Sequence, residues 1–364
     1  MPKIRADATP TSPDLFFAKE LAGEEPPSFT AMKRLYDRAS DLFGFRPWKI
    51  LNENELVVTR DSKSGESWYC SVMGSMGEVY SMQAYRGEEG LSLFRSIAAE
   101  DLTDPGEVLA SMHCLSVEFV PRKELKRQDR DLLAALGHPQ GRGLASPIFR
   151  VIRPGFHPWF VNAEEARTLA ECIRSVVVIC AAIANQKDVH FLDQADTYPI
   201  VTRADVAEPR YNIDLIKPVL PPQPPVTPLN LPEELLRPLR GCDYAVRGAM
   251  ELEYIFSGAA VGKANERAAY VAIALAVDAE TGIVYAPEAI DTSVPPAEAL
   301  ARVFLKAVQS NRVLPIEVRL RNQKHAASLG SLMESLGVKL RIANHLPAAE
   351  EARAHLLGFM GGKL

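Results

Sequence analysis

The chain has 364 residues, of which 47% are hydrophobic and 24% are charged, so it can form two or three globular domains with ordinary buried cores. The formal net charge of -5 argues against a protein devoted to nucleic-acid binding, which usually carries a basic face. No apolar run reaches the ~20 residues of a membrane span, and residues 1–13 lack an apolar signal segment, so a cytoplasmic protein without a membrane anchor is expected.

The sequence predicts neither a metal site nor a cofactor. Its five cysteines are odd in number and none of them forms a C-x-x-C pair, which argues against a disulfide framework or a zinc knuckle. Cys172 and Cys180 lie in an apolar helical run, so both are expected to be buried core thiols. No P-loop, dinucleotide fingerprint or nucleophile elbow is present.

Hydrophobic periodicity predicts a loosely held tail over 1–27 and an α+β domain with antiparallel sheets over 28–217, folded either as one unit or as two, 28–110 and 111–217. The helices expected in this region are 29–43, 88–99, 127–136 and a long helix capped by Asn162. The expected strands are 55–60, 66–73, 78–85, 113–120, 147–153, 198–202 and 211–216.

Local motifs fix two of these boundaries. Asp61-Ser-Lys-Ser-Gly65 begins with Asp and ends with Gly, which is typical of a type I turn closed by a left-handed glycine between two antiparallel strands. Asn162 stands three residues before Glu165, as in a capping box at a helix start. Residues 218–228 contain six prolines in eleven positions, so 218–230 is predicted to be a stiff linker and 231–364 a separate domain.

Four motifs of the N-terminal part are Trp68-Tyr-Cys-Ser-Val-Met-Gly74, Tyr85-Arg-Gly-Glu-Glu-Gly-Leu91, Pro154-Gly-Phe-His-Pro-Trp159 and Asn162-Ala-Glu-Glu-Ala-Arg167. Together they resemble the motifs of a bacterial family of unknown function. The resemblance covers about 30–215, and the C-terminal third, with Asn344-His-Leu-Pro347, resembles the partner domain that often follows. The resemblance implies a pair of domains and no established activity.

The C-terminal domain is expected to be an α/β module with the element order β-β-β-α-β-α-β-α. Strands are predicted over 250–256, 269–277, 283–290, 316–320 and 338–342. Helices are predicted to start at Pro295-Pro296, after Asn322 and near Pro347. This order resembles the connectivity of a ribonuclease-H-like module with a mixed sheet.

Ribonuclease-H-like nucleases hold two divalent metals with carboxylates on the first strand, at the end of the fourth strand and on a late helix. The candidates here are Glu251, Glu253, Glu317 and Glu350, with Glu351 as a neighbour on the last helix. The fourth strand ends in Arg319-Leu-Arg321-Asn322, where a cation and a neutral amide replace the required acid. The glutamates are therefore expected to be solvated surface carboxylates.

The function expected from the sequence is a non-catalytic binding or regulatory module. Candidate ligand-binding residues in the N-terminal domain are Trp68, Tyr85, His157 and Trp159. His157 lies in the rigid loop 153–160, and loops on rigid scaffolds often carry binding groups. In the C-terminal domain, Arg319, Arg321 and Asn322, with Lys324, Lys339 and Arg341, are candidates for contact with a small anion or with nucleic acid. For the whole chain, a protein or a small anionic ligand is the expected partner and nucleic acid is not. The alternative is a metal-dependent nuclease or phosphodiesterase of the ribonuclease-H-like type.

Overall fold

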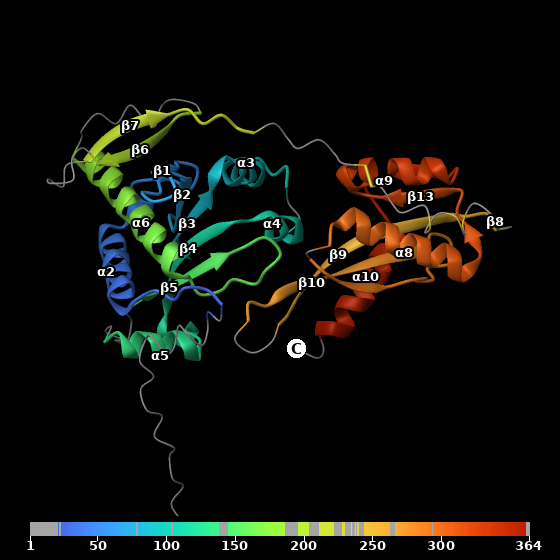
Figure 1. Cartoon of the computed structure of the whole chain (residues 1–364), viewed down its shortest axis with the longest axis horizontal. Helices are drawn as coiled ribbons and strands as arrows, with labels where there is room; N and C mark the ends of the chain where they lie inside the picture. The colour runs from blue at the N-terminus through green and yellow to red at the C-terminus, as the bar shows by residue number, and fades with distance from the viewer. Residues whose placement is uncertain are drawn as a thin grey trace, which may run out of the picture. The chain divides into compact units, whose positions relative to one another are not determined.

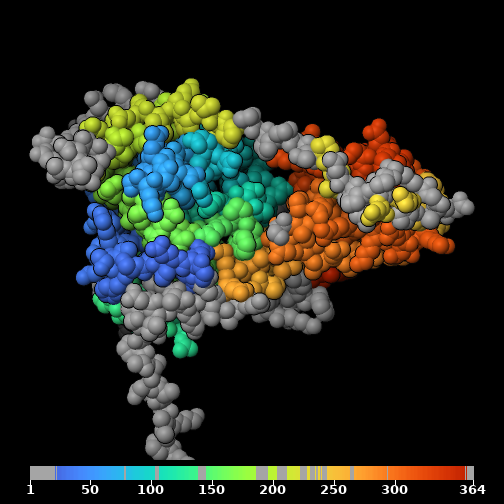
Figure 2. All heavy atoms as spheres, viewed as in Figure 1, coloured from blue at the N-terminus to red at the C-terminus, as the bar shows by residue number. Residues whose placement is uncertain are grey.

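The structure is a computed structural model. It describes residues 21, 23–77, 79–102, 105–137, 145–185, 196–203, 211–221, 228–229, 234, 237, 239, 244–262, 266–292 and 294–361. The chain forms two compact units, the first comprising Met1–Asp104, Ser111–Pro221 and Gly262–Arg267, and the second comprising Pro105–Ala110, Pro222–Val261 and Ala268–Leu364. Most of the first unit is drawn in blue to yellow-green and most of the second in orange to red (Figures 1 and 2). The main division falls inside the proline-rich segment predicted as a linker.

The first unit is built on one seven-stranded sheet in the order β5-β4-β3-β2-β1-β6-β7. Neighbouring strands are antiparallel, except that β1 and β6 are parallel, so the predicted antiparallel sheet is mixed at this one pair. Because β3 and β4 pair along their length, the alternative of two folds, 28–110 and 111–217, is wrong. The strands are β1 (Val57–Arg60), β2 (Ser67–Met73), β3 (Tyr80–Arg86), β4 (Cys114–Pro121), β5 (Ala145–Ile152), β6 (Tyr198–Arg203) and β7 (Tyr211–Ile216).

Helices cover both faces of this sheet (Figure 1). α2 and α6 pack on one face, and α3 packs on the other against β2 and β3. α6 begins at the predicted capping box, in which Asn162 and Glu165 bond each other's backbone N–H groups. The short helix α4 was not predicted from the sequence. The helices of this part of the chain are α2 (Phe29–Phe45), α3 (Gly87–Ala98), α4 (Pro105–Ser111), α5 (Arg127–Ala135) and α6 (Ala163–Ala184), with short 3-10 turns at Pro47–Lys49 and Arg122–Glu124.

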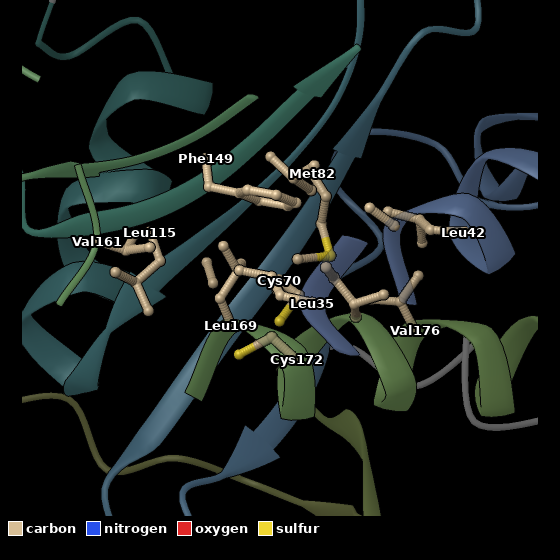
Figure 3. Packing of buried hydrophobic residues seen from close by; sticks show 14 of the residues in the cluster. Leu35, Leu42, Cys70, Met82, Leu115, Phe149, Val161, Leu169, Cys172 and Val176 are labelled. Carbon is tan, nitrogen blue, oxygen red and sulfur yellow. The ribbon is translucent and has the colours of Figure 1, made fainter. Parts of the chain in front are cut away.

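The core of the first unit lies between the sheet and the two helices α2 and α6 (Figure 3). Cys172 and Cys180 are buried here, as predicted. Leu21 also belongs to this core with 3% of its surface exposed, so the expected loose tail does not extend over its last residues, and residues 1–20 lie outside the described part. Core side chains labelled in the figure come from α2, four strands, α6 and the segment before it, namely Leu35, Leu42, Cys70, Met82, Leu115, Phe149, Val161, Leu169, Cys172 and Val176.

The same turn occurs once in each unit. Asp61 accepts hydrogen bonds at Oδ1 from the backbone of the two residues Lys63 and Ser64, and Asp278 accepts the corresponding bonds from Glu280 and Thr281. In both turns the closing glycine has a positive φ, 75° in the first unit and 71° in the second, which a residue with a side chain adopts at a cost. The turn predicted at Asp61 is confirmed.

The second unit contains a five-stranded mixed sheet in the order β11-β10-β9-β13-β14. β9, β10 and β11 are antiparallel neighbours, whereas β13 is parallel to both β9 and β14. The helices α8, α9 and α10 follow β11, β13 and β14, so the predicted order of these elements is confirmed. Their bounds are β9 (Ala249–Val261), β10 (Ala269–Asp278), β11 (Glu288–Asp291), α8 (Pro296–Asn311), β13 (Glu317–Leu320), α9 (Gln323–Ser335), β14 (Lys339–Ile342) and α10 (Pro347–Gly361).

Two features of the second unit differ from the sequence prediction. β11 is shorter than the predicted 283–290, because the ladder before it is reduced to the single bridge between Val277 and Val284 and Pro287 cannot donate a ladder hydrogen bond. A small parallel pair, β8 (Ala245–Val246) with β12 (Val313–Leu314), was not predicted, since two-residue strands carry no periodicity.

Helices cover both faces of the second sheet. α8 and α9 pack on one face, around Leu252, Phe304 and Leu329. α10 packs on the other face, where Ala349 and Ala352 meet Ile255 and Leu275. Among the described residues, no helix combines the length and the apolar character that crossing a membrane requires.

Candidate functional site

The candidate site of the second unit is an ionic cluster on the face of the sheet that α10 covers. The parallel register pairs Glu251 of β9 with Arg319 of β13, so these two side chains lie on the same face. By alternation Glu253 and Arg321 lie on this face one step further along each strand. The first turn of α10 brings Glu350 to the same place, since its carboxylate contacts Arg321. We call Glu251, Glu253, Arg321, Glu350 and Arg353 the ionic cluster.

Glu251 is a buried cap for α10. Its side chain is 1% exposed, and its Oε2 accepts a hydrogen bond of 2.9 Å from the backbone N–H of Ala349. The first N–H groups of a helix have no partner within the helix, and the helix dipole favours a negative charge there. This contact uses the carboxylate to hold α10 on the sheet. The expectation that Glu251 is a solvated surface carboxylate is wrong, because α10 covers its face of β9.

Glu253 contacts two guanidinium groups of the cluster. Its Oε1 lies 2.7 Å from Nη2 of Arg321 and 3.5 Å from Nη1 of Arg353. Its Oε2 is buried and has no hydrogen-bond partner among the described residues. Burial raises the pKa of this carboxyl, although the two guanidinium groups act in the opposite direction. Glu253 is 6% exposed, so the expectation of a solvated carboxylate is wrong here as well.

Glu350 completes the cluster from the half-exposed side. Its Oε1 accepts a hydrogen bond of 3.3 Å from the backbone N–H of Leu346 and lies 3.4 Å from Nη2 of Arg321. Nδ1 of His345 lies 3.8 Å from the same oxygen. A single guanidinium, that of Arg321, therefore contacts carboxylates from both β9 and α10. Its side chain is 38% exposed, so solvent reaches it from one side.

Glu317 is the predicted acid that does not join the ionic cluster. It lies between three cations of β13 and β14, with its oxygens 2.7 Å from Nε of Arg319, 3.5 Å from Nζ of Lys339 and 3.8 Å from Nη1 of Arg341. The hydrogen bond from Arg319 is the main reason why the pKa of Glu317 is lowered. We call Glu317, Arg319, Lys339 and Arg341 the basic patch, because three cations face one carboxylate.

Asn322 caps helix α9 with its amide oxygen. It precedes α9, and its Oδ1 accepts hydrogen bonds from the backbone of Lys324 and His325, at 2.8 and 3.1 Å. Asn322 is thus the N-cap that the sequence predicted.

The aromatic candidates of the first unit do not form one site. Trp68 belongs to the core face of the sheet, whereas Tyr85 lies on the opposite face with Tyr69, its partner on β2. Tyr85 packs against Phe94 of α3 with ring centroids 5.2 Å apart, and its hydroxyl donates to Gln83. The two side chains are 6% and 5% exposed, so neither presents its ring to solvent.

The loop before α6 carries the other two candidates. Trp159 forms a β-bridge with Val151 and packs edge-on against Phe160, with ring centroids 5.7 Å apart. Nδ1 of His157 lies 3.1 Å from the carbonyl oxygen of Pro158. Both side chains are half-buried parts of the loop packing.

Sequence reasoning missed Arg353, which follows Glu350 by three residues and so lies on the same side of α10. The spacing alone gives no reason to choose it over other helix cations. Within the described residues, no group of three or more His, Cys, Asp or Glu side chains is arranged to hold a metal ion. The chemistry of the cluster is that of acids neutralised by guanidinium groups and backbone N–H groups.

Comparison with protein families finds two matches, one in the N-terminal part of the chain and one in the C-terminal part. Residues 33–203 match the family described as Domain of unknown function (DUF7309), and residues 237–357 match Domain of unknown function (DUF6930). The chain therefore carries two domains of unknown function in tandem. Comparison with curated proteins and with solved structures finds no match. A pair of such domains is what the sequence motifs implied.

Proposed function

We propose that this chain is a non-catalytic binding protein whose second unit is a ribonuclease-H-like scaffold. In this scaffold the carboxylates are paired with cations and N–H groups of the protein instead of metal ions. The strand order β11-β10-β9-β13-β14, with three antiparallel strands followed by two parallel ones, supports the ribonuclease-H-like assignment. The observation that carries the proposal is the position of Arg321. It stands at the end of β13, where such a fold would need an acid, and it contacts Glu253 and Glu350.

The partners of the four glutamates support the absence of metal catalysis. Two-metal catalysis needs carboxylate oxygens that are free to bind cations on both sides of a phosphodiester. Glu251 accepts a helix N–H, Glu253 and Glu350 contact Arg321, and Glu317 contacts Arg319. A metal would have to displace a positively charged guanidinium that is already within hydrogen-bond distance. Protein cations thus supply the neutralisation that metal ions would supply in an enzyme.

The ligand that fits this scaffold is a small anion bound at the basic patch. Arg319, Lys339 and Arg341 carry three positive charges, and Glu317 cancels one of them. The side chains of Lys339 and Arg341 are 71% and 59% exposed, so they can reach an anion in solution. Arginine and lysine on a rigid sheet are well suited to phosphate and carboxylate groups.

Two titrations test the proposal. Mg²⁺ and Mn²⁺ are added while thermal unfolding and the cleavage of a generic DNA and a generic RNA are followed, and neither stabilisation nor cleavage is expected. Inorganic phosphate is then added at constant ionic strength, which should raise the unfolding temperature. The double variant Lys339→Ala/Arg341→Ala should lose this rise, whereas Lys306→Ala, an exposed change on α8, should keep it. No rise with phosphate in the unmodified protein would contradict the anion site.

The alternative function is a metal-dependent nuclease or phosphodiesterase. One observation favours it, namely that carboxylates from β9 and α10 converge on the position of a single guanidinium. An enzyme of this kind would require Arg321 to swing out and the metal to replace it. Metal-linked stabilisation that Glu253→Gln abolishes, together with cleavage, would establish this alternative and overturn the non-catalytic reading.

A further inference from the structure

A pocket of about 440 Å³ opens between α10 and the segment that joins β10 to β11. It is separate from the ionic cluster, because its residues on α10 lie on the side of the helix away from Glu350 and Arg353. The α10 residues at the pocket are spaced three and four residues apart, so they lie on one side of the helix. Its lining includes Thr281 and Val284 on one side and Ala348, Glu351, Ala352, His355 and Leu356 of α10 on the other.

The body of the pocket is apolar. Val284 and Leu356 pack at the edge of the small core beneath α10, and Ala352 is buried within it. Pockets that bind small molecules have volumes of roughly 300–1,000 Å³ and are mostly apolar, with a few polar groups that orient the ligand. This pocket falls at the lower end of that range. Its alanine wall leaves room for a flat ring, since alanine fills little of the space beside a helix.

The rim of the pocket carries one carboxylate, that of Glu351, together with the exposed imidazole of His355. Glu351 is exposed and makes no hydrogen bond or ion pair with another described residue. Glu280, also exposed, precedes Thr281 in the turn that forms the opposite wall. The hydroxyl of Thr281 donates to Asp278, so this wall offers no free hydroxyl proton to an anion. A carboxylate beside an apolar cavity complements a cation that is attached to an apolar group.

We propose that this pocket binds a small amphipathic amine, with an apolar body about the size of one aromatic ring and a protonated nitrogen that pairs with Glu351. The apolar body lies against Val284, Ala352 and Leu356, and the ammonium group lies at the rim. The site is independent of the basic patch, which has the opposite charge.

Two probes with the same ring and opposite charge test this assignment. The methyl groups of alanine are labelled with ¹³C, and NMR spectra follow the addition of 2-phenylethylammonium or 3-phenylpropionate at pH 7.5. The amine should shift the signals of Ala348 and Ala352 saturably and leave that of Ala301, in the core on the other face of the sheet, unchanged. The carboxylate should bind at least about fivefold more weakly, as expected for a partly solvated ion pair. Equal affinities, or the absence of saturable shifts with the amine, would overturn the proposal.

Variants locate the binding site. Ala348→Phe places a ring in the pocket from a half-exposed helix position and should abolish the shift of Ala352, whereas Ala354→Phe, at an exposed position of the same helix, should not. Glu351→Gln should keep binding of the ring but remove the preference for the amine. Binding that survives Ala348→Phe would show that the amine binds elsewhere, and a preference that survives Glu351→Gln would show that Glu351 is not the partner of the ammonium group; either result would overturn the proposal.

Discussion

Replacement of Arg321 by methionine is the perturbation that examines the ionic cluster most closely. Methionine keeps much of the unbranched apolar side chain and removes the guanidinium, so Glu253 loses the contact at 2.7 Å. Removing one partner of a buried ion pair typically costs 3–5 kcal/mol, because a buried charge is left without compensation. Arg321 is 38% exposed and Arg353 remains 3.5 Å from Glu253, so we expect a loss of about 2 kcal/mol.

The matched control is Arg319→Met on the same strand. Arg319 pairs with Glu317, which keeps Lys339 and Arg341 after the change. A solvent-accessible pair of this kind contributes about 0–1 kcal/mol, so the control should lose less than about 1 kcal/mol.

The pH dependence of the free energy of unfolding is a second measure of the contact between Glu253 and Arg321. Burial raises the pKa of Glu253 above its ordinary value of 4.5, so the folded state binds more protons than the unfolded chain between the two pKa values. The free energy of unfolding therefore falls as the pH rises through this window. Arg321→Met removes a cation that lowers the pKa of Glu253, so the cost of the substitution should shrink as the pH is lowered and the carboxyl becomes neutral.

Far-UV circular dichroism during urea unfolding measures the cost, and hydrogen exchange of β9 amides assigns it to the second unit. Tryptophan emission reports the first unit only, because the three tryptophans are Trp48, Trp68 and Trp159. The double variant Glu253→Gln/Arg321→Met should recover most of the loss, since the carboxylate that Arg321 compensates is then absent. A loss no larger than that of Arg319→Met, or no recovery in the double variant, would refute the reasoning.

Three further predictions concern the fold, each measured by urea unfolding. Asp61→Asn should cost about 3 kcal/mol and Asp278→Asn about 1 kcal/mol. Asp61 is buried and forms an ion pair with Arg167 of α6, so it loses more than Asp278, and equal costs would contradict this. Gly74→Ala should cost more than about 2 kcal/mol, since its Cβ would lie 2.7 Å from a tyrosine ring at a φ of 136°, whereas Gly65→Ala meets no atom within 4 Å and should cost about 1 kcal/mol. Leu169→Ala should cost about 3–4 kcal/mol because the residue is fully buried, and a loss below about 1 kcal/mol would show that the core relaxes around it.

Most of the fold could be predicted from local sequence signals. The apolar spacing of α6, its Asn162 cap and the Asp61 turn each act within a few residues, and all of them appear as predicted. The parallel pairing of β1 with β6 could not be predicted, because it joins segments separated by most of the first unit. α4 and β8 are too short for their periodicity to stand out from the surrounding sequence.

The sequence predicted which residues belong to the candidate site better than it predicted their burial and their contacts. The sequence indicated that Arg321 stands where an acid would be required, and the structure adds that it contacts Glu253 and Glu350. The burial of Glu251 and Glu253 was missed, because alternation along β9 shows only that they share a face, and whether a helix covers that face depends on where α10 docks. Arg353 was missed for the same reason, because its contact with Glu253 also depends on where α10 docks.

The central claim is that protein cations close the carboxylate site to metal ions, and Mn²⁺ tests it most directly. Paramagnetic Mn²⁺ broadens the NMR signals of nuclei near its binding site, so the backbone amide signals of Glu253 and Glu350 are followed as the ion is added. We predict no more broadening there than at Glu334, an exposed glutamate on α9. Selective loss of both cluster signals at low Mn²⁺, with Glu334 unaffected, would show that the acids bind metal and would contradict the account.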